Sequence, residues 1–192
     1  MSRIVNESVG KFTQHYPRLA AIVTVQAGGR MNAMAAAWHS PLSFKPPLFG
    51  VSIAPNRHTY ALISEVKEFG MNFLPYEEAE LAAAVGGSSG KRVDKFQRFN
   101  IAVNKPAKTS VPILQVAYAA YECRLVDDRL YGDHRWLVGE VMAVHLLKEA
   151  FTADEVVDLS NVSPALYMGN DFYAAVSGRM GRRLERGIYG KR

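Results

Sequence analysis

The sequence predicts a mainly β protein of antiparallel strands with helical inserts. Short runs rich in β-branched and apolar residues recur along the chain, separated by glycine, proline and polar turn residues. The regular alternation of strand and helix that a doubly wound parallel sheet needs is missing. Two long β-type runs, Gln115–Val126 and Arg135–Leu147, follow Pro112 and are typical of a hairpin that closes a barrel.

The first predicted hairpin lies near the N-terminus. Leu19–Val25 is rich in β-branched residues, and the glycine pair at 28–29 is a turn signal, so Met31–Trp38 is expected to pair back as the second strand. The alanines of this second run also fit a helix, but the glycine pair before it and the Ser-Pro break after it favour a strand. Small side chains on that strand would allow a flat molecule to approach the backbone closely.

The middle of the chain is predicted from its prolines, glycines and apolar runs. Pro41 and the Pro46-Pro47 pair restrict the backbone and predict a loop, whereas the Gly86-Gly87 pair is a normal helix exit. The pair Asp127-Asp128 is predicted as the polar turn of the last hairpin. The remaining predicted elements are a loop over Ser40–Pro47, a strand over Leu48–Ile53, a helix over Thr59–Val66, a strand over Phe69–Leu74, a helix over Glu77–Val85, a loop over Gly86–Lys91 and a short helix over Asp94–Phe99.

The length of 192 residues predicts one domain, residues 1–192, which is large enough to bury a core of its own. Cys123 is the single cysteine, so no intrachain disulfide can form, as suits a reducing compartment. No apolar run is long enough for a membrane span, and the N-terminus lacks the layout of a signal peptide. We therefore expect a soluble, cytoplasmic protein without membrane contacts.

Positive charge is concentrated in a basic tail at about 178–192. The net charge is +5, and the tail contains Arg179, Arg182, Arg183, Arg186, Lys191 and Arg192. A nucleic-acid-binding segment is one interpretation of such a tail. A solvated terminus or a subunit-contact arm is favoured, because Tyr189 is the one aromatic residue placed among the basic side chains for base stacking. A basic protein also attracts anionic small molecules by electrostatic steering.

The segment Asn56-Arg57-His58-Thr59 is a candidate phosphate site, since a strand ends there and a helix begins. The first amides of a helix are unpaired, and the helix dipole adds partial positive charge. A guanidinium from Arg57, an imidazole from His58 and a hydroxyl from Thr59 would add donors for a phosphate. From these residues alone, a simple helix cap with an exposed arginine and histidine is the competing interpretation.

The loop from Gly86 to Lys91 is a second candidate for anion binding. It is not a Walker A motif, because Val85 and Arg92 stand where that motif needs glycine and Ser or Thr. Its free amides, the hydroxyls of Ser88 and Ser89 and the charge of Lys91 would still suit an anion. A mobile surface loop is the alternative.

A flat ligand is suggested by the run from Asn32 to Ser43. Ala36 and Ala37 are small enough for close approach, and Trp38, His39 and Ser40 follow. Trp38 is equally well explained as a core aromatic residue, and His39 as a surface or interface residue. Asn32 fits either a ligand contact or a turn cap, and the buried amide expected at Asn72 needs partners of some kind.

Together these motifs resemble the flavin reductase-like family, the FMN-binding split β-barrels that include flavoredoxins and NAD(P)H:flavin oxidoreductases. The resemblance is carried by Asn32–Ser43, by Asn56-Arg57-His58-Thr59, by Asn72 and by the run from Gly87 to Phe96, which is similar to the family's Gly-Ser-x-Ser-Gly-x-x-x-Asp-Lys-Phe at Gly87, Ser88, Ser89, Gly90, Asp94, Lys95 and Phe96. It implies that FMN is contacted by Asn32, Ala36, Ala37, Trp38, His39, Ser40, Ser43, Arg57, His58, Thr59, Asn72, Ser88, Ser89, Lys91, Lys95 and Phe96.

The resemblance also implies a function. NADH or NADPH would reduce FMN by hydride transfer, an unknown acceptor would receive the electrons, and the protein would form a homodimer with flavin near the interface. A flavoredoxin-type electron carrier with tightly held FMN and little NAD(P)H turnover is one alternative, and a basic nucleic-acid-binding barrel is another. No catalytic residue is predicted, and no metal site, since His15, His134 and His145 are scattered without partners at ligand spacing.

Overall fold

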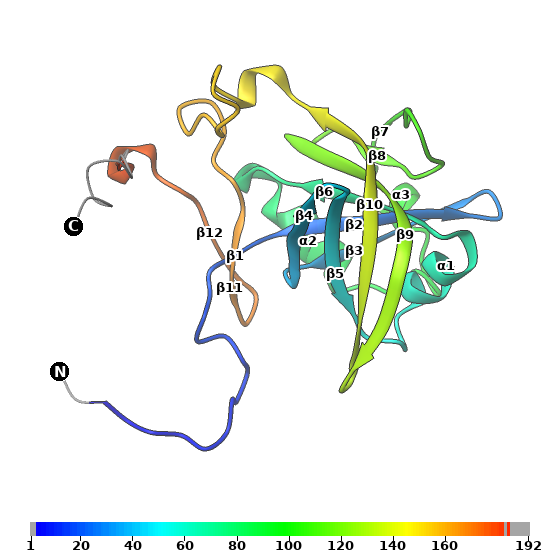
Figure 1. The fold of residues 1–192 in the computed structure, drawn as a ribbon, viewed down its shortest axis with the longest axis horizontal. Coiled ribbons are helices and arrows are strands. Elements are labelled where there is room, and N and C mark those ends of the chain that lie inside the picture. Colours follow the sequence, from blue (N-terminus) through cyan, green and yellow to red (C-terminus); the bar gives the residue numbers. More distant parts are fainter. Residues whose placement is uncertain (1–2, 183, 185–192) are drawn as a thin grey trace.

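The computed structural model describes residues 3–182 and 184, and its body is an antiparallel β structure with helices on its outside. A seven-stranded sheet has the order β3-β2-β6-β9-β10-β5-β4. A three-stranded sheet, β1-β11-β12, and the pair β7-β8 complete the strands of the described part. Figure 1 shows the first and the last described segments of the chain on the same side of this body.

The bounds of the elements are as follows. The strands are β1 Arg18–Leu19, β2 Ala21–Ala27, β3 Arg30–Ala36, β4 His39–Phe44, β5 Pro47–Ile53, β6 Glu68–Phe73, β7 Val103–Asn104, β8 Ile113–Leu114, β9 Ala119–Tyr131, β10 His134–Leu146, β11 Leu166–Gly169 and β12 Phe172–Ala174. The helices are α1 His58–Val66, α2 Ala79–Gly86 and α3 Lys95–Arg98, with short 3-10 turns at Tyr76–Glu78, Lys148–Ala150 and Gly178–Met180.

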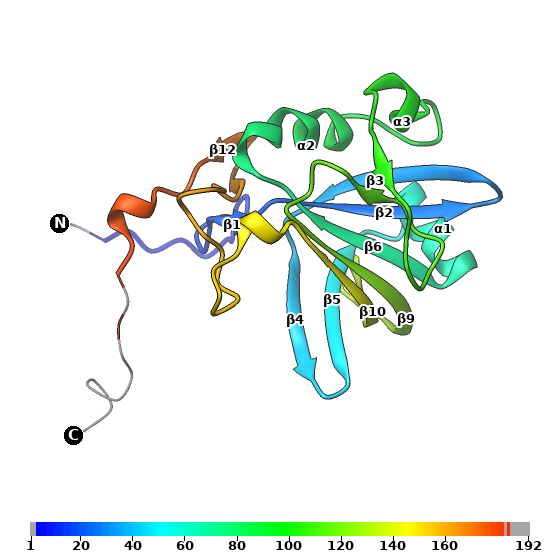
Figure 2. The ribbon, with the colours of Figure 1, turned by 90° about the horizontal axis from the view of Figure 1, so that it is seen from above.

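The first five residues of strand β2 are buried on both faces, which explains why they are apolar apart from Thr24. Val23 packs in a core cluster with Ile63 of α1 and Leu137 of β10. Ile22 belongs to a second cluster, with Val85 of α2. Figure 2 shows α2 and α3 above β2 and β3. The β4–β5 and β9–β10 hairpins extend away on the opposite side, so the barrel is open between these hairpins and β2–β3.

Two expectations for the chain path were wrong. The predicted loop over Ser40–Pro47 is mostly strand β4, which pairs with β5 alone at the edge of the sheet, where Pro41 costs no ladder hydrogen bond. The predicted turn at Asp127-Asp128 lies within β9, next to a register shift, and the chain reverses instead at residues 132–133, where Gly132 has a φ of +61°. The Asp128 carboxylate is used structurally, since it accepts a hydrogen bond of 2.6 Å from Arg135 Nε.

The other predicted strands and helices are present within a few residues of their expected ends. Among the described residues, none of the helices combines the length and apolar character that crossing a membrane requires. The same part of the chain holds no group of three His, Cys, Asp or Glu side chains placed to bind a metal ion. Most of the predicted basic tail, residue 183 and residues 185–192, lies outside the described residues.

Candidate functional site

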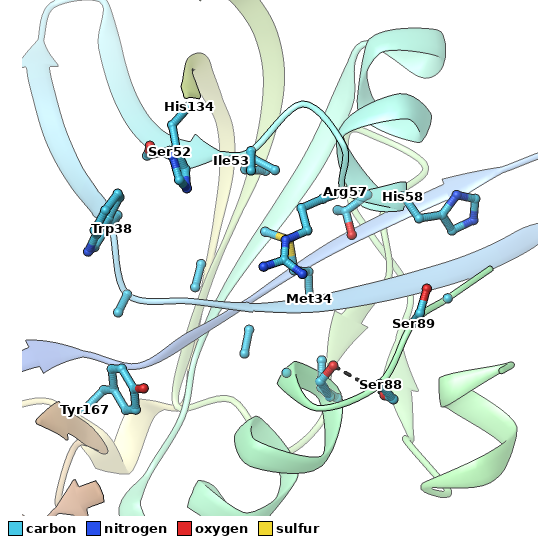
Figure 3. Close-up of a pocket in the computed structure, with 18 of the residues that line it drawn as sticks. Met34, Trp38, Ser52, Ile53, Arg57, His58, Ser88, Ser89, His134 and Tyr167 are labelled. Atoms are coloured by element: carbon cyan, nitrogen blue, oxygen red, sulfur yellow. Dashed lines mark hydrogen bonds between the residues drawn. The ribbon is translucent and has the colours of Figure 1, made fainter. Parts of the chain in front are cut away.

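An open cavity of about 390 Å³ lies where β3, the end of β5, the start of α1 and the loop after α2 come together (Figure 3). We call this the main cavity. One end is basic, the middle is lined by small and apolar side chains, and the far end is aromatic. Its wall includes Tyr16, Met34, Ala35, Ala36, Ala37, Trp38, Ser52, Ile53, Arg57, His58, Thr59, Val85, Ser88, Ser89, Lys95, His134 and Tyr167.

The basic end begins at the N-terminus of α1. Arg57 is the residue before the helix, with extended backbone at φ −74° and ψ 137°, and the first turn contains no acidic side chain. The positive end of the helix dipole is therefore not neutralised by the helix itself. In Figure 3 the Arg57 side chain reaches toward the middle of the cavity, while His58 lies toward its rim.

Lys95 places a buried ammonium group at the same end. Its Nζ donates hydrogen bonds to the carbonyl oxygens of Ala33 at 2.8 Å and Val85 at 2.7 Å. No carboxylate pairs with it among the described residues. Burial, together with the charge of Arg57, lowers the pKa of Lys95 to about 8. An anion bound in the cavity would therefore neutralise the positive charge of Lys95, which no carboxylate of the described residues neutralises.

His58 adds a neutral donor or acceptor rather than a further charge. Burial lowers its pKa, and the positive charges of Lys91, Arg30 and Lys95 lower it further. Lys91 does not line the main cavity, but its charge is felt at His58. Two cationic side chains, Arg57 and Lys95, thus line this end of the cavity, and the charges of Arg30 and Lys91 act on it from outside the wall, which suits a ligand group of double negative charge.

The glycine-serine loop is shaped by contacts behind the wall. Ser88 Oγ donates to the carbonyl of Ala84 at 2.9 Å and so extends the end of α2. Asn32 Nδ2 donates to Thr59 Oγ1 at 2.8 Å, in a buried bond that joins β3 to α1. A side chain at Gly90 would collide with Asn32 Oδ1, so the absence of a Cβ there allows the loop to lie against this pair.

The middle of the cavity suits a flat ring. The small side chains of Ala35, Ala36 and Ala37 line the cavity along and just after β3. Ile53 and Val85 provide apolar walls beside them. A planar, partly apolar group is able to approach the backbone of β3 closely, where amides and carbonyls are available for its polar edge.

The aromatic end was missed by sequence reasoning, apart from Trp38. The indole Nε1 of Trp38 donates to Tyr16 Oη at 2.8 Å, and the Trp38 ring centroid lies 5.0 Å from that of His134. Tyr16 packs against Tyr167, with ring centroids 5.9 Å apart. Pairing of β1 with β11 brings Tyr16 near Tyr167, and the β10-β5-β4 part of the large sheet brings His134 near Trp38. These residues are far apart in the chain, so no local spacing marks them.

Nine of the sixteen predicted residues lie on the wall of the main cavity, and seven do not. The seven are Asn32, His39, Ser40, Ser43, Asn72, Lys91 and Phe96. Asn32 lies directly behind the wall, hydrogen-bonded to Thr59. Phe96 is buried in the core cluster between α3 and β2.

Asn72, His39 and Ser40, which belong to that group, have structural partners in the described chain. Asn72 is buried, with Nδ2 donating to the Ile22 carbonyl at 3.0 Å and Oδ1 accepting from the Leu114 amide at 2.8 Å. His39 Nε2 lies 2.9 Å from the Leu19 carbonyl and its ring stacks on Phe49. Ser40 Oγ donates to the carbonyl of Pro41, and Ser43 lies on the edge strand β4, away from the main cavity.

Comparisons of the sequence and of the structure with known proteins agree on one family. A family model described as the flavin reductase like domain matches residues 13–175. An FMN-binding protein from Thermus thermophilus, solved with bound 1-cyclohex-2-enone, is 33% identical in sequence, with a TM-score of 0.85 over 95% of this chain and 99% of that chain. Flavoredoxin from Methanosarcina acetivorans is similar in fold, with a TM-score of 0.83 at 24% identity over 98% of each chain. The predicted fold, a mainly β antiparallel split barrel, is confirmed.

Two further relatives are similar in sequence over most of this chain. An uncharacterized protein of Pyrococcus abyssi is 35% identical over 136 residues, which are 71% of this chain and 78% of that protein. An uncharacterized protein of Aeropyrum pernix is 32% identical over 159 residues, which are 80% of this chain. The match spans only 58% of the length of the Aeropyrum protein.

Proposed function

This chain belongs to the flavin reductase-like family, and we propose that its main cavity binds FMN and that NADH or NADPH reduces this flavin by hydride transfer. The observation that carries the proposal is the pairing of an unneutralised basic end with a slot of small residues. Arg57, Lys95 and the start of α1 would hold the phosphate. The ring would lie along Ala35–Ala37, since FMN combines a dianionic phosphate with a flat, partly apolar ring.

The chemistry of hydride transfer would be supplied by the flavin when it is bound. The part played by this chain is binding and placement. Thr59 and Ser89 offer hydroxyls beside the basic end. The apolar side chains of Met34 and Ile53 would keep water from the bound ring, and the aromatic end would leave one side of the slot accessible to a second ring. The charge of Lys95 and Arg57 would also favour the reduced, anionic state of the ligand.

We further propose that two copies associate. Large apolar side chains stand exposed on the β4–β5 hairpin and on the end of β10, with Phe44 95% exposed and Leu42, Val144 and Leu146 about half exposed. Leaving such an apolar surface in water is unfavourable, which supports a homodimer. Gel filtration with light scattering tests this part independently of the flavin.

The first test is an absorption spectrum of the protein as purified, followed by denaturation and identification of the released chromophore. Two flavin bands, with FMN released at near one per chain, are the expected result. A colourless protein that also fails to take up added FMN would contradict the proposal. Riboflavin serves as a matched control ligand, because it carries the same ring without the phosphate.

The second test separates the reductase from the electron carrier. The FMN-loaded protein is mixed with NADH or NADPH in the absence of oxygen, and bleaching of the flavin is followed. Rapid bleaching supports the reductase and identifies the donor. Retention of FMN with no bleaching by either nucleotide would instead favour the flavoredoxin-type carrier.

A further inference from the structure

A second cavity, of about 690 Å³, adjoins the aromatic end of the main cavity. We call it the vestibule. Trp38, Ser52 and His134 line both cavities, so the two spaces share one wall. Figure 3 shows these three side chains grouped at one side of the main cavity, on the side away from His58. A molecule in the vestibule would therefore lie next to the slot proposed for the flavin ring.

The walls of the vestibule are aromatic and held in place. The Trp38 indole is fixed by its hydrogen bond to Tyr16. The Trp136 indole packs against Gly50, where any added side chain would collide with it. Phe12 contributes a further ring, edge-on to Trp38 with centroids 6.1 Å apart. Rigid aromatic faces of this kind favour a small planar, largely apolar ligand.

His134 is the polar group of this wall. Its Nδ1 lies 2.8 Å from Asp133 Oδ1, and its side chain is 29% exposed. The hydrogen bond and the charge of His134 lower the pKa of Asp133, so this carboxylate stays ionised beside the ring and fixes its orientation through Nδ1. No hydrogen bond occupies His134 Nε2 within the described part of the chain, so this nitrogen is available to a ligand.

We propose that the vestibule binds a small planar α,β-unsaturated carbonyl compound as the hydride acceptor, and that His134 is the catalytic residue that donates the proton. This inference rests on the proposed function, since the hydride must come from reduced FMN in the main cavity. Aromatic walls select the planar ligand, and His134 Nε2, held toward the cavity by the Nδ1 contact with Asp133, is the position from which an N–H would reach a carbonyl oxygen.

The step balances as a two-electron reduction. The β-carbon of the acceptor receives a hydride from reduced flavin, the carbon–carbon π bond breaks, and its electron pair moves to the carbonyl oxygen. His134 Nε2 gives its proton to that oxygen, which forms an enol, and the enol rearranges to the saturated carbonyl compound. Oxidised flavin and neutral His134 remain, and the imidazole regains a proton from water.

Binding is tested with trans-cinnamaldehyde and the oxidised, FMN-loaded protein, which cannot reduce it. We expect saturable perturbation of the flavin absorption bands. Phe12→Ala, in an exposed position outside the main cavity, should weaken this binding by about tenfold and leave FMN affinity unchanged. Phe172→Ala, at an exposed residue of β12, should change neither. Absence of binding to the unaltered protein, or equal affinity in Phe12→Ala, would overturn the vestibule assignment.

Proton donation is tested with protein reduced by one equivalent of dithionite, so that the result does not depend on NAD(P)H turnover. Anaerobic trans-cinnamaldehyde should reoxidise the flavin and yield 3-phenylpropanal. His134→Gln, which keeps a hydrogen-bond donor without a transferable proton, should slow this reoxidation by about 100-fold or more.

Two readouts separate this role from a structural one. In His134→Gln, affinity for trans-cinnamaldehyde should stay within about twofold of the unaltered protein. Reoxidation by ferricyanide, which takes electrons without a proton, should proceed at the unaltered rate. If His134→Gln is reoxidised by trans-cinnamaldehyde as fast as the unaltered protein, His134 is not the donor. If the protein binds no FMN, the reoxidation experiment has no reduced flavin to follow, and that result contradicts the proposed function and not the role of His134.

Discussion

Asn32 Oδ1 stands in the space that a Cβ atom on Gly90 would have to occupy. The glycine-serine loop therefore packs its backbone directly on a buried amide, whose Nδ2 is already committed to Thr59 Oγ1. The relationship ties three parts of the site together: the loop after α2, strand β3 and the start of α1. It also shows why Asn32 matters even though it does not line the main cavity.

Gly90→Ala tests this relationship. The added methyl group should displace Asn32 and break its bond to Thr59, at a cost of about 1–3 kcal/mol for the buried polar groups left unpaired. We expect a lower free energy of unfolding in urea and weaker FMN retention. Gly87→Ala is the matched control in the same loop, because a Cβ there approaches only the Ala83 carbonyl, at 3.3 Å. Equal effects of the two substitutions would contradict the explanation.

Arg57→Ala tests the basic end of the main cavity. Charge-assisted hydrogen bonds are worth about 1.5–3 kcal/mol each, so FMN affinity should fall by roughly tenfold or more. Affinity for riboflavin should change little, and the free energy of unfolding should stay within about 0.5 kcal/mol, since Arg57 is exposed. Arg98→Ala removes an exposed arginine outside the cavity and serves as the charge-matched control. Equal FMN affinities in the two variants would remove Arg57 from the phosphate site.

The strands were predictable because their alternation and turn residues are local. Leu19–Val25 followed by two glycines specifies the β2–β3 hairpin with little help from the rest of the chain. Proline misled the prediction at Ser40–Pro47, because its cost depends on whether the strand is central or at an edge. Neighbouring strands decide that point, and the sequence of the segment itself does not reveal it.

Site residues were predictable where a short motif places them together. Arg57, His58 and Thr59 enter the wall as one segment at a helix start. His39 differs, because it begins β4 and its ring turns toward Phe49. Tyr16, His134 and Tyr167 were missed, since they come from three separate segments that only the folded chain unites. Asn72 was expected to be buried with partners, and its amide is fully used between β2 and β8.

The pH dependence of FMN binding should report on Lys95. Its pKa is about 8 in the protein without ligand, and a bound phosphate favours the protonated ammonium. Affinity is therefore fully present below pH 8 and should weaken as the pH rises above 8, by up to about tenfold per pH unit. Calorimetric titrations between pH 7 and pH 9.5 measure this slope. His58 adds nothing in that window, because its pKa is lowered below its usual value.

Two controls identify the group responsible for that slope. Riboflavin binding to the unaltered protein should stay nearly constant over the same range, because no phosphate faces the ammonium group. Lys95→Met should bind FMN more weakly at pH 7 and lose the dependence on pH. A slope that persists in Lys95→Met would assign the titration to another residue.

The loop from Ala107 to Thr109 is held by a buried carboxylate, and acid should release it. Glu122 is fully buried; its Oε1 lies 2.6 Å from His145 Nε2 and accepts from the Ala107 amide, while Oε2 accepts from Lys108 and Thr109. Burial raises the pKa of Glu122, but the hydrogen bonds from the Ala107 amide and from His145 outweigh it, and the pKa falls to about 2.

Glu122→Gln should lower the free energy of unfolding by about 3 kcal/mol at pH 7, because donors that met a carboxylate would face an amide group. The folded pKa lies below the unfolded one, near 4.5. The stabilisation is therefore complete above pH 4.5 and is lost as the pH falls toward 2. Urea unfolding at pH 7, 4 and 3 should show the gap between the two proteins closing. Glu68→Gln, which affects the more exposed bonds to Ser110, is the matched control and should cost less. A gap that stays constant down to pH 3 would mean that Glu122 acts by shape and packing, and not by its charge.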